Sequence, residues 1–249
     1  MNVVLAGYRS WAYTIFKALT KIDSKIWQIH GLITTKNSER NFQNLGISTL
    51  IVNPQELDNQ EVIRKLRVFK PDVFLFYGWS WIIPKEIHSK YLCLILHPSP
   101  LPKYRGGSPI QNQIIAGERE SAVTILQVGE KIDAGEIYSQ TPFSLEGTLD
   151  VVFARIVKIG TKDTTKVLYA IAENAAKPIP QDESKATIYK RRKPEDSELT
   201  IEDFQSKTAK ELYNFIRALD DPYPNAYIVC KDGKKLFLRS ALIEKKDHI

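Results

Sequence analysis

Short apolar runs alternate with helical patterns along the first third of the chain. Four of these runs have the length of strands: residues 2–6, 26–34, 47–52 and 72–78. The last run is apolar almost throughout, which is typical of a strand buried on both faces. A helical spacing follows the first run, and residues 55–70 form an amphipathic helix that Pro71 ends. Strands that alternate with helices predict an α/β fold with a mostly parallel sheet and right-handed crossovers.

The pattern changes after a fifth apolar strand, which ends at His97. Further elements are expected at residues 110–117 (short helix), 122–128 and 136–145 (antiparallel strands) and 148–174 (long helix). Residues 176–190 are rich in proline and polar side chains and are interpreted as a linker. The remainder contains one helix, at 208–219, and a hairpin closed by Asp232-Gly233. We therefore predict a core at 1–175, a linker at 176–190 and a small α+β appendage at 191–249.

Composition narrows the class of protein. The chain has 249 residues, of which 43% are hydrophobic, so it can bury a core. No apolar run is long enough to cross a membrane, and the N-terminus lacks the pattern of a secretory signal, so we expect a cytoplasmic protein. Two cysteines provide no disulfide framework and no metal-ligand spacing. The net charge of +6 is spread along the chain, so nucleic acid is a weaker interpretation than a solvated surface or a phosphorylated small molecule.

Ligands of parallel sheets bind where the strands end at their carboxyl side. Three loops leave that edge: GYRSW after the first strand, YGWSWIIP after the fourth and HPSPLPKYRGG after the fifth. The first loop has only one glycine, so it lacks the G-x-G-x-x-G pattern of dinucleotide-binding proteins. We expect no bound NAD.

The fifth-strand loop has the residues of a catalytic site. His97 can move a proton near neutral pH, and Asp133, in the turn K-I-D-A-G-E, is a candidate to orient it. The alternative remains that His97 only ends the strand and Asp133 only accepts backbone hydrogen bonds in its turn. The prolines make the loop stiff, and two glycines, Gly106 and Gly107, let backbone approach a ligand closely. Ser108-Pro109 is expected to start a helix, with the serine as its cap.

Two motifs give the chain a family resemblance. HPSPLPKYRGGSPIQ is similar to the H-x-S-x-L-P-x-x-x-G signature of formyltransferases that use 10-formyltetrahydrofolate, and LQVGEKIDAGEI resembles their second motif, whose aspartate matches Asp133. DVFLFYGWSWIIP resembles the segment that lines their folate pocket. RRKPEDSELTIEDF and IRALDDPYPNAY are similar to the C-terminal part of the enzymes that formylate nucleotide-linked amino sugars. The resemblance implies a Rossmann-like formyltransferase core, with 10-formyltetrahydrofolate as co-substrate.

The activity implied by this resemblance is transfer of the formyl group to the primary amine of a nucleotide-linked amino sugar, for surface polysaccharide such as lipopolysaccharide. Three residues would be catalytic, with His97 moving the proton and Asp133 orienting it: His97, Asp133 and Ser99. The folate segment would supply Tyr77, Gly78, Trp79, Ser80, Trp81, Ile82 and Ile83. Substrate contacts are expected from Tyr8, Arg9, Ser10, Arg105, Gly107, Gln111 and Tyr223. Relatives of this kind often form homodimers, which we also expect here.

Simpler interpretations of several of these residues stay open. Trp79 and Trp81 could be core or dimer contacts, and Arg9 could be a solvated side chain. Arg105 could hold its loop to neighbouring acidic groups instead of binding substrate. The basic pair Arg191 and Arg192 could meet the nucleotide or remain solvated.

One position departs from the family pattern. The family usually has an asparagine two residues before the histidine, where this chain has Ile95. Positions two apart in a strand share a face, so Ile95 and His97 should both face the site. Loss of one oxyanion donor typically lowers the rate by about a hundred- to a thousandfold. Three outcomes are open: another donor substitutes (Ser99, Gln111, Asn112 or a backbone N–H), the enzyme is slow, or the chain is a sugar-nucleotide or folate-binding protein.

Two other acceptors compete with the amino sugar. The resemblance extends to methionyl-tRNA formyltransferases, which carry a larger basic β-barrel at the C-terminus than the segment after the linker here. The enzymes that formylate glycinamide ribonucleotide resemble the chain less and lack the RALDDPYPNAY-like tail.

Overall fold

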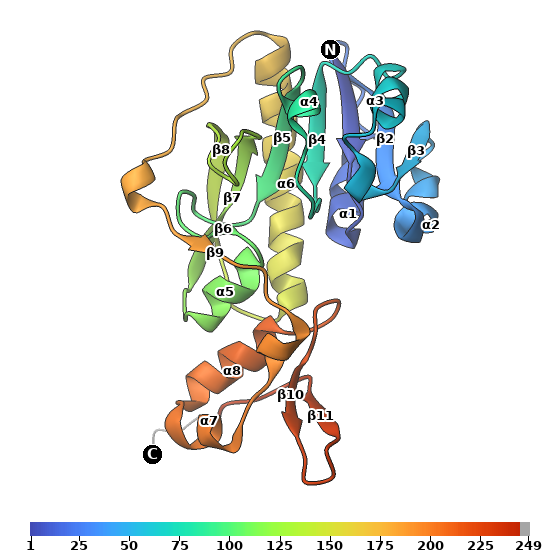
Figure 1. The fold of residues 1–249 in the computed structure, drawn as a ribbon. Coiled ribbons are helices and arrows are strands. Elements are labelled where there is room, and N and C mark those ends of the chain that lie inside the picture. Colours follow the sequence, from blue (N-terminus) through green and yellow to red (C-terminus); the bar gives the residue numbers. More distant parts are fainter. Residues whose placement is uncertain (245–249) are drawn as a thin grey trace.

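The computed structural model describes residues 1–244, and seven of its strands form one sheet (Figure 1). The order across the sheet is β3-β2-β1-β4-β5-β7-β8. The bounds are β1 (Asn2–Ala6), β2 (Gln28–Thr35), β3 (Thr49–Val52), β4 (Val73–Tyr77), β5 (Leu92–His97), β7 (Glu120–Gln127) and β8 (Ile137–Ser144). The five strands from β3 to β5 pair in parallel, while β7 and β8 are antiparallel. The prediction of an α/β fold with a mostly parallel sheet is confirmed.

Helices cover both faces of this sheet. The long helix α6 (Leu149–Ala172) and α1 (Ser10–Leu19) pack together on one face, while α3 (Gln60–Arg67) and α4 (Lys85–His88) lie on the other. The alternation of side chains along β4 explains its apolar sequence. Val73, Leu75 and Tyr77 belong to the first core, and Phe74 and Phe76 to the second. Full burial of each of these side chains stabilises the fold by about 1.5–3 kcal/mol.

The helix expected at residues 55–70 is shorter in the structure. A 3-10 turn occupies Pro54–Glu56, and α3 begins only at Gln60. The reason is the asparagine before it: the Asn59 side chain accepts a hydrogen bond from the Glu61 backbone N–H and caps the helix there. Elsewhere the expected helices agree within a few residues, including α5 (Pro109–Ile115), and a short α2 (Glu39–Phe42) precedes β3.

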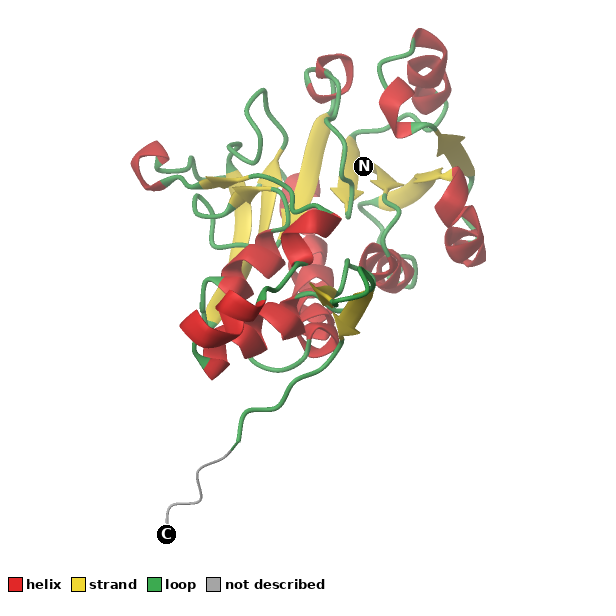
Figure 2. Ribbon diagram, turned by 60° about the horizontal axis from the view of Figure 1, so that its bottom comes forward, coloured by secondary structure: helices red, strands yellow, loops and turns green. Residues whose placement is uncertain are grey.

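The C-terminal region is a small α+β unit, as predicted. It contains the predicted helix, α8 (Ala209–Ala218), and the hairpin of β10 (Ala226–Val229) and β11 (Lys235–Leu238). A second helix, α7 (Ile201–Ser206), was not predicted, and residues 245–249 of the predicted appendage lie outside the described residues. Its own core consists of Leu199, Ile216, Leu219 and Ala226. Figure 2, turned so that this end comes forward, shows its helices and hairpin beside each other. Helix α8 packs on α5, and α5 directly follows the fifth-strand loop, so the unit lies next to the carboxyl ends of β4 and β5 (Figure 1).

The predicted linker has defined contacts along its length. Beyond α6 the chain runs down the outside of β8 to β9 (Ile188–Tyr189) (Figure 1). There β9 pairs in parallel with β6 (Arg105–Gly106), and Ile179 bridges Ile137. We call residues 179–192 the strap. Its mostly polar sequence has no strand periodicity, so the pattern alone gave no sign of this pairing.

Two kinds of feature are absent from the described residues, a membrane-spanning helix and a metal-binding cluster. None of the helices in residues 1–244 is long and apolar enough to span a bilayer. Within the same residues, no three or more His, Cys, Asp or Glu side chains come together as a metal site.

Candidate active site

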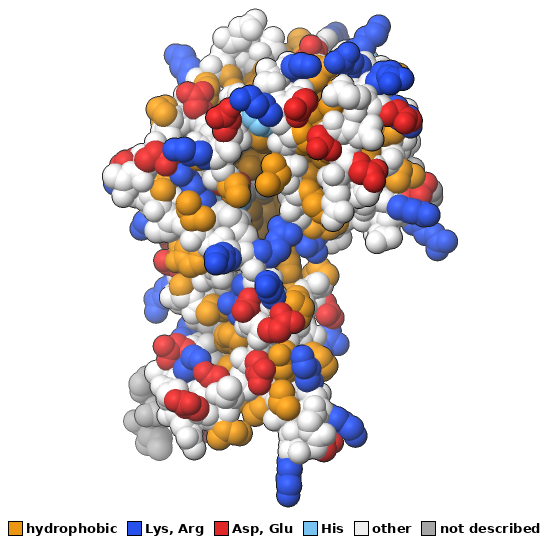
Figure 3. Space-filling view, viewed as in Figure 1, with side chains coloured by type: hydrophobic (Ala, Val, Ile, Leu, Met, Phe, Trp, Pro, Cys, Tyr) orange, Lys and Arg blue, Asp and Glu red, His pale blue; other side chains and the backbone are white. Residues whose placement is uncertain are grey.

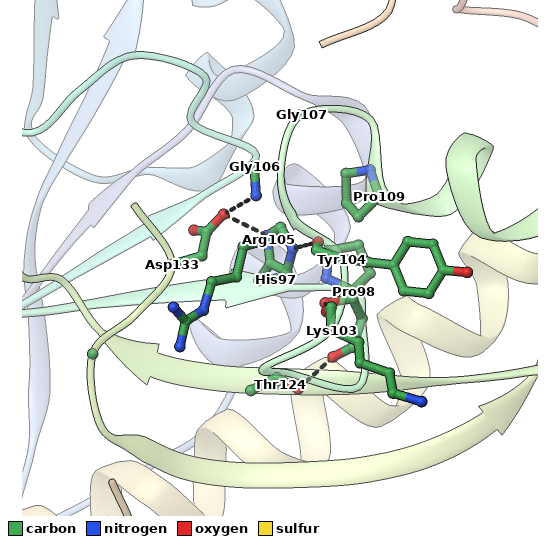
Figure 4. A network of polar contacts seen from close by, with 12 residues as sticks. His97, Pro98, Lys103, Tyr104, Arg105, Gly106, Gly107, Pro109, Thr124 and Asp133 are labelled. Atoms are coloured by element: carbon green, nitrogen blue, oxygen red, sulfur yellow. Dashed lines mark hydrogen bonds and ion pairs between the residues drawn. The ribbon is translucent and has the colours of Figure 1, made fainter. Parts of the chain in front are cut away.

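His97 is the last residue of β5 and is 7% exposed. Its ring is held by two oxygen atoms (Figure 4). Nε2 lies 2.8 Å from the carbonyl oxygen of Tyr104, and Nδ1 lies 3.4 Å from Oδ2 of Asp133. A carbonyl oxygen only accepts hydrogen bonds, so Nε2 is the donor in the first contact. The other ring nitrogen, Nδ1, is the one beside the Asp133 carboxylate.

Asp133 lies in the turn that joins β7 and β8, with a φ of +50°. This left-handed conformation costs a non-glycine residue about 1–3 kcal/mol and is concentrated at functional sites. The same oxygen that faces His97 also accepts a hydrogen bond of 2.8 Å from the Gly106 backbone N–H. The structure thus brings together the two residues that the sequence analysis paired.

Ser99 was predicted to be catalytic, which requires its side chain to reach the cleft, but the structure places it elsewhere. It is fully buried and does not line the cleft described below. Its hydroxyl donates to the Lys103 carbonyl at 2.9 Å, and its own carbonyl accepts from the Thr124 hydroxyl at 2.7 Å. These bonds close the loop upon itself and on β7, so the geometry favours a structural role for Ser99.

The two glycines lie against the strap, and Gly106 also lines the cleft described below. A Cβ atom on Gly106 would lie 2.3 Å from the Tyr189 carbonyl oxygen, and one on Gly107 would lie 2.3 Å from the Arg191 Cα atom. Neither distance leaves room for a side chain. Ser108 also differs from expectation: it is left-handed (φ +51°), and its hydroxyl accepts from the Arg192 backbone N–H instead of capping α5.

A cleft of about 440 Å³ opens between the carboxyl edge of the sheet and the C-terminal region. His97, Asp133 and Ile95 line it together, as the strand alternation predicted for Ile95 and His97. The volume is in the range of small-molecule sites. Figure 3 shows a hollow with hydrophobic side chains in its wall and Lys or Arg side chains along its lower edge.

Six of the seven residues predicted for folate line this cleft, from Gly78 to Ile83. The exception is Tyr77, which is fully buried and hydrogen bonds to the Thr164 hydroxyl at 2.8 Å. Its ring stacks on Phe16 in the core beneath α1. Burial raises the pKa of this phenol, and the hydrogen bond opposes that effect more weakly. Alternation along β4 makes residue 77 point inward, while residue 76 faces the cleft side.

Three of the seven predicted substrate residues line the cleft: Arg9, Gln111 and Tyr223. The Arg9 guanidinium lies 5.7 Å from the Tyr223 ring centre and 4.7 Å from that of Tyr8. Tyr8 supports the wall from behind, since its hydroxyl donates to the Ser80 hydroxyl. Ser10 begins α1 with an exposed side chain, and neither it nor Gly107 is part of the lining.

Arg105 points away from the cleft. It is 2% exposed, and its guanidinium donates to Oε1 of Gln181 and to both carboxylate oxygens of Glu183. Of the two interpretations of Arg105, the structure supports the one in which it holds its loop to neighbouring groups. The acceptors come from the strap, far along the chain, which is why the loop sequence alone could not identify them.

Sequence reasoning missed several lining residues. Phe153 of α6 stacks on Tyr223, with ring centres 6.1 Å apart and planes at 14°. Its place in a helical apolar stripe made it look like an ordinary core residue. Arg191 and Arg192 of the strap, which the sequence analysis offered either as nucleotide contacts or as solvated side chains, also reach the cleft.

Three donor atoms in the lining have no hydrogen-bond partner within residues 1–244: Nε2 of Gln111, Nε1 of Trp79 and Nε of Arg192. Most buried polar groups in proteins are paired, so such groups are candidates for ligand contacts. Gln111 also lies beside Tyr223. Burial raises the pKa of the Tyr223 phenol, and the positive charge of Arg9 acts in the opposite direction.

The chain was compared with known protein families. Residues 29–151 match the family model described as formyl transferase, and residues 193–249 match formyl transferase, C-terminal domain. The curated methionyl-tRNA formyltransferase of Bacillus cytotoxicus is 33% identical over 71% of this chain and 56% of that protein. That of Campylobacter lari is 30% identical over 98% of this chain and 81% of that protein. The chain therefore spans little more than half the length of the first of these relatives.

Solved structures have the same fold. A methionyl-tRNA formyltransferase from Clostridium thermocellum is 29% identical, with a TM-score of 0.71 over 95% of this chain and 96% of that chain. A 4-N formyltransferase from Francisella tularensis is 21% identical, with a TM-score of 0.78 over 98% of both chains.

Proposed function

The chain belongs to the formyl transferase family, and we propose that it transfers a formyl group from 10-formyltetrahydrofolate to the primary amine of a nucleotide-linked amino sugar. The observation that carries this proposal is the His97–Asp133 pair. Both residues line a cleft with an aromatic wall on one side and, on the other, arginines that have no carboxylate partner among residues 1–244.

The folate side is the segment from Gly78 to Ile83. The rings of Trp79 and Trp81 lie 5.3 Å apart in an edge-on arrangement, and Ile82 is 80% exposed beside them. Flat apolar side chains with a few polar atoms suit a heteroaromatic ring. The unpaired indole N–H of Trp79 would donate to an acceptor on the ring edge. Tetrahydrofolate has such a ring.

The chemistry needs a proton to leave the attacking amine. The amine nitrogen bonds to the formyl carbon, and the carbonyl electrons move to oxygen, giving a tetrahedral oxyanion. Nε2 of His97 already carries a hydrogen toward the Tyr104 carbonyl, so Nδ1 takes the amine proton. Asp133, 3.4 Å away, stabilises the charged ring that results. The oxyanion then collapses, the bond from carbon to folate N10 breaks, and N10 receives the proton.

The oxyanion needs a hydrogen-bond donor that Ile95 cannot supply. Of the replacements considered, Ser99 donates to the Lys103 carbonyl behind the loop, and the Asn112 amide donates to the Gly107 carbonyl. Gln111 is 3% exposed and lines the cleft, and its Nε2 atom has no partner within residues 1–244. A buried donor left unpaired costs about 1–3 kcal/mol, which a ligand oxygen recovers. We assign Gln111 as the donor to the formyl oxygen.

The acceptor side supports an anionic, ring-containing substrate. Within residues 1–244, Arg9, Arg191 and Arg192 line the cleft without an ion pair to any carboxylate. Arginine binds phosphate through paired N–H groups. The stacked rings of Phe153 and Tyr223 offer a face for a nucleobase. A nucleotide-linked amino sugar combines phosphate, base and amine in one small molecule.

Methionyl-tRNA is the second candidate acceptor. It is favoured by the names of the curated relatives and of the Clostridium thermocellum structure, which is 29% identical. Its α-amine lies on an ester next to a phosphate backbone, so the same arginines would serve. Following the family resemblance, our proposal further includes a cytoplasmic homodimer whose product enters surface polysaccharide such as lipopolysaccharide.

The experiment is a competition between acceptors. The purified protein is mixed with 10-formyltetrahydrofolate and, in separate reactions, with methionyl-tRNA and with amino sugars linked to uridine, thymidine and guanosine diphosphate. Mass spectrometry detects the formylated product. We expect formylation of at least one sugar nucleotide at a higher kcat/KM than methionyl-tRNA. A higher kcat/KM for methionyl-tRNA would show that the acceptor is the tRNA and not a sugar nucleotide. If no amine is formylated although the protein still binds folate, a binding protein without catalytic activity would be favoured.

A further inference from the structure

The two oxygen atoms that hold His97, the Tyr104 carbonyl and the Asp133 carboxylate, belong to residues whose backbone conformation is unfavourable. Tyr104 has a φ of +60° and Asp133 a φ of +50°, although neither is a glycine. Residues of this kind persist only where the surrounding structure fixes them. The loop of Tyr104 and the turn of Asp133 are 29 residues apart in the chain, so something must fix both against each other.

The strap fixes the Tyr104 side through backbone hydrogen bonds. The Tyr104 N–H donates to the Thr187 hydroxyl at 2.8 Å, and the Arg105 N–H donates to the Thr187 carbonyl at 2.9 Å. The Gly107 N–H donates to the Tyr189 carbonyl at 2.8 Å. The rings of Tyr104 and Tyr189 stack with their centres 4.9 Å apart. The strap therefore sets the position of the carbonyl that His97 contacts.

One strap residue, Gln181, fixes the Asp133 side. Its Nε2 atom donates to the carbonyl oxygens of Asp133 and Gly135, at 2.9 and 2.7 Å. Its Oε1 atom accepts two hydrogen bonds, of 3.1 and 2.8 Å, from the guanidinium of Arg105. Arg105 is in turn paired with Glu183 at 2.7 Å. Both ends of the Gln181 amide are in use, and they connect the His97 loop to the Asp133 turn.

We propose that Gln181 is a positioning residue, which holds the Asp133 carboxylate against the His97 ring. Gln181 is not part of the cleft lining, so it acts on the reaction through the Asp133 turn and the His97 loop that it connects. The catalytic part of this inference rests on the proposed function, because it assumes that the His97–Asp133 pair does the chemistry. The geometric part, that Gln181 sets the environment of the His97 ring, stands apart from any activity.

The test uses two variants of the full-length protein and a matched control. Gln181→Ala removes the whole clamp. Gln181→Glu keeps an acceptor for Arg105 but places oxygen against the two carbonyls, so it removes only the bonds to the turn. The control is Arg155→Ala, because Arg155 likewise donates to two carbonyls of one turn, those of Ser144 and Glu146, away from the cleft.

We expect both Gln181 variants to lower kcat by roughly tenfold or more, since small displacements of a catalytic group have effects of that order. KM for folate and for the amine should stay within about twofold, because Gln181 touches neither ligand. Arg155→Ala should leave kcat within about twofold of the wild type. An equal loss of kcat in Arg155→Ala would contradict a specific role for Gln181.

A second measurement does not depend on turnover. Nitrogen NMR of the histidine side chains, with the His97 signals assigned by their loss in His97→Ala, reports the hydrogen bonds of the ring. We expect the His97 ring signals to move in both Gln181 variants and to stay in place in Arg155→Ala. Unchanged His97 signals in both Gln181 variants would overturn the inference. If the wild type formylates no amine, the proposed function fails while this measurement still decides the role of Gln181.

Discussion

The loops after β4 and β5 leave neighbouring strands at the same edge of the sheet, but they are built in opposite ways. In the β5 loop, the polar groups around His97 are paired with the strap, with the Asp133 turn or within the loop. In the β4 loop, the Trp79 indole N–H has no partner in the described part of the chain, and Ile82 is largely exposed. A group that moves a proton must be held in place, whereas a wall that binds a flat ring gains from polar atoms left free for it.

This contrast divides the two functions of the cleft between two segments. Changes in the β5 loop should lower kcat and leave folate binding intact. Changes in the β4 loop should weaken folate binding with a smaller effect on kcat. Variants that produce the reverse pattern would break the comparison.

The largest effect is expected at His97. His97→Ala removes the group that takes the amine proton, and general-base catalysis typically contributes about 10²–10⁴ in rate. We therefore expect kcat to fall by that factor, and Asp133→Asn to reduce it as well, because the charged ring loses its partner. Single-turnover kinetics checks this, with folate affinity by calorimetry as the control. Wild-type rates in both variants would remove the proposed mechanism.

The second effect concerns the donor to the oxyanion. Gln111→Leu has a similar volume but no amide, and loss of one such donor costs about 10²–10³ in kcat. Gln111→Glu replaces the amide NH₂ group with a carboxylate oxygen, so its kcat should be as low as that of Gln111→Leu. A kcat of Gln111→Glu close to the wild type would show that Gln111 does not act as the hydrogen-bond donor. The measurement is kcat at saturating folate and amine.

A smaller effect is expected in the β4 loop. Trp79→Phe keeps an aromatic ring but removes the unpaired indole N–H, and a single neutral hydrogen bond is worth about 0.5–1.5 kcal/mol, or up to about tenfold in affinity. Calorimetric titration with tetrahydrofolate should show this weakening, with kcat close to the wild type. A drop in kcat with unchanged folate affinity would contradict the division between the two loops.

The smallest effect is expected at Ile95. Ile95→Asn restores an amide next to His97 in a position that lines the cleft. Because Gln111 already provides a donor in our account, the variant should be tolerated or mildly activated. Steady-state kinetics checks this, and a large loss of kcat would show that the site depends on the isoleucine itself.

The sequence allowed the main features of this picture to be predicted, but not the details of the loop. Short apolar runs that alternate with helical patterns identified the strands, and their order placed His97 at the correct edge of the sheet. The inward direction of Tyr77 was also accessible, because alternation along β4 places it on the same face as Val73 and Leu75. The roles of Arg105 and of the strap were not accessible. They depend on hydrogen bonds between segments about 80 residues apart, such as Arg105 with Gln181 and Glu183, and hydrogen-bond partners at that separation leave no periodic pattern.

The two glycines of the loop illustrate the same limit. Glycine predicts that something comes close to the backbone, and this was correct for Gly106 and Gly107. What comes close in the structure is a distant part of the same chain, Tyr189 and Arg191. Local sequence predicts the need for space but does not identify the neighbour.

The most direct test of the account follows a labelled formyl group. 10-Formyltetrahydrofolate with an isotope in the formyl carbon is mixed with the wild type or with His97→Ala, together with the preferred sugar nucleotide from the acceptor panel. The account predicts that the label appears on the amine of the sugar nucleotide with the wild type and stays on folate with His97→Ala. Label remaining on folate with the wild type for every nucleotide-linked amine, or equal transfer by both proteins, would contradict it.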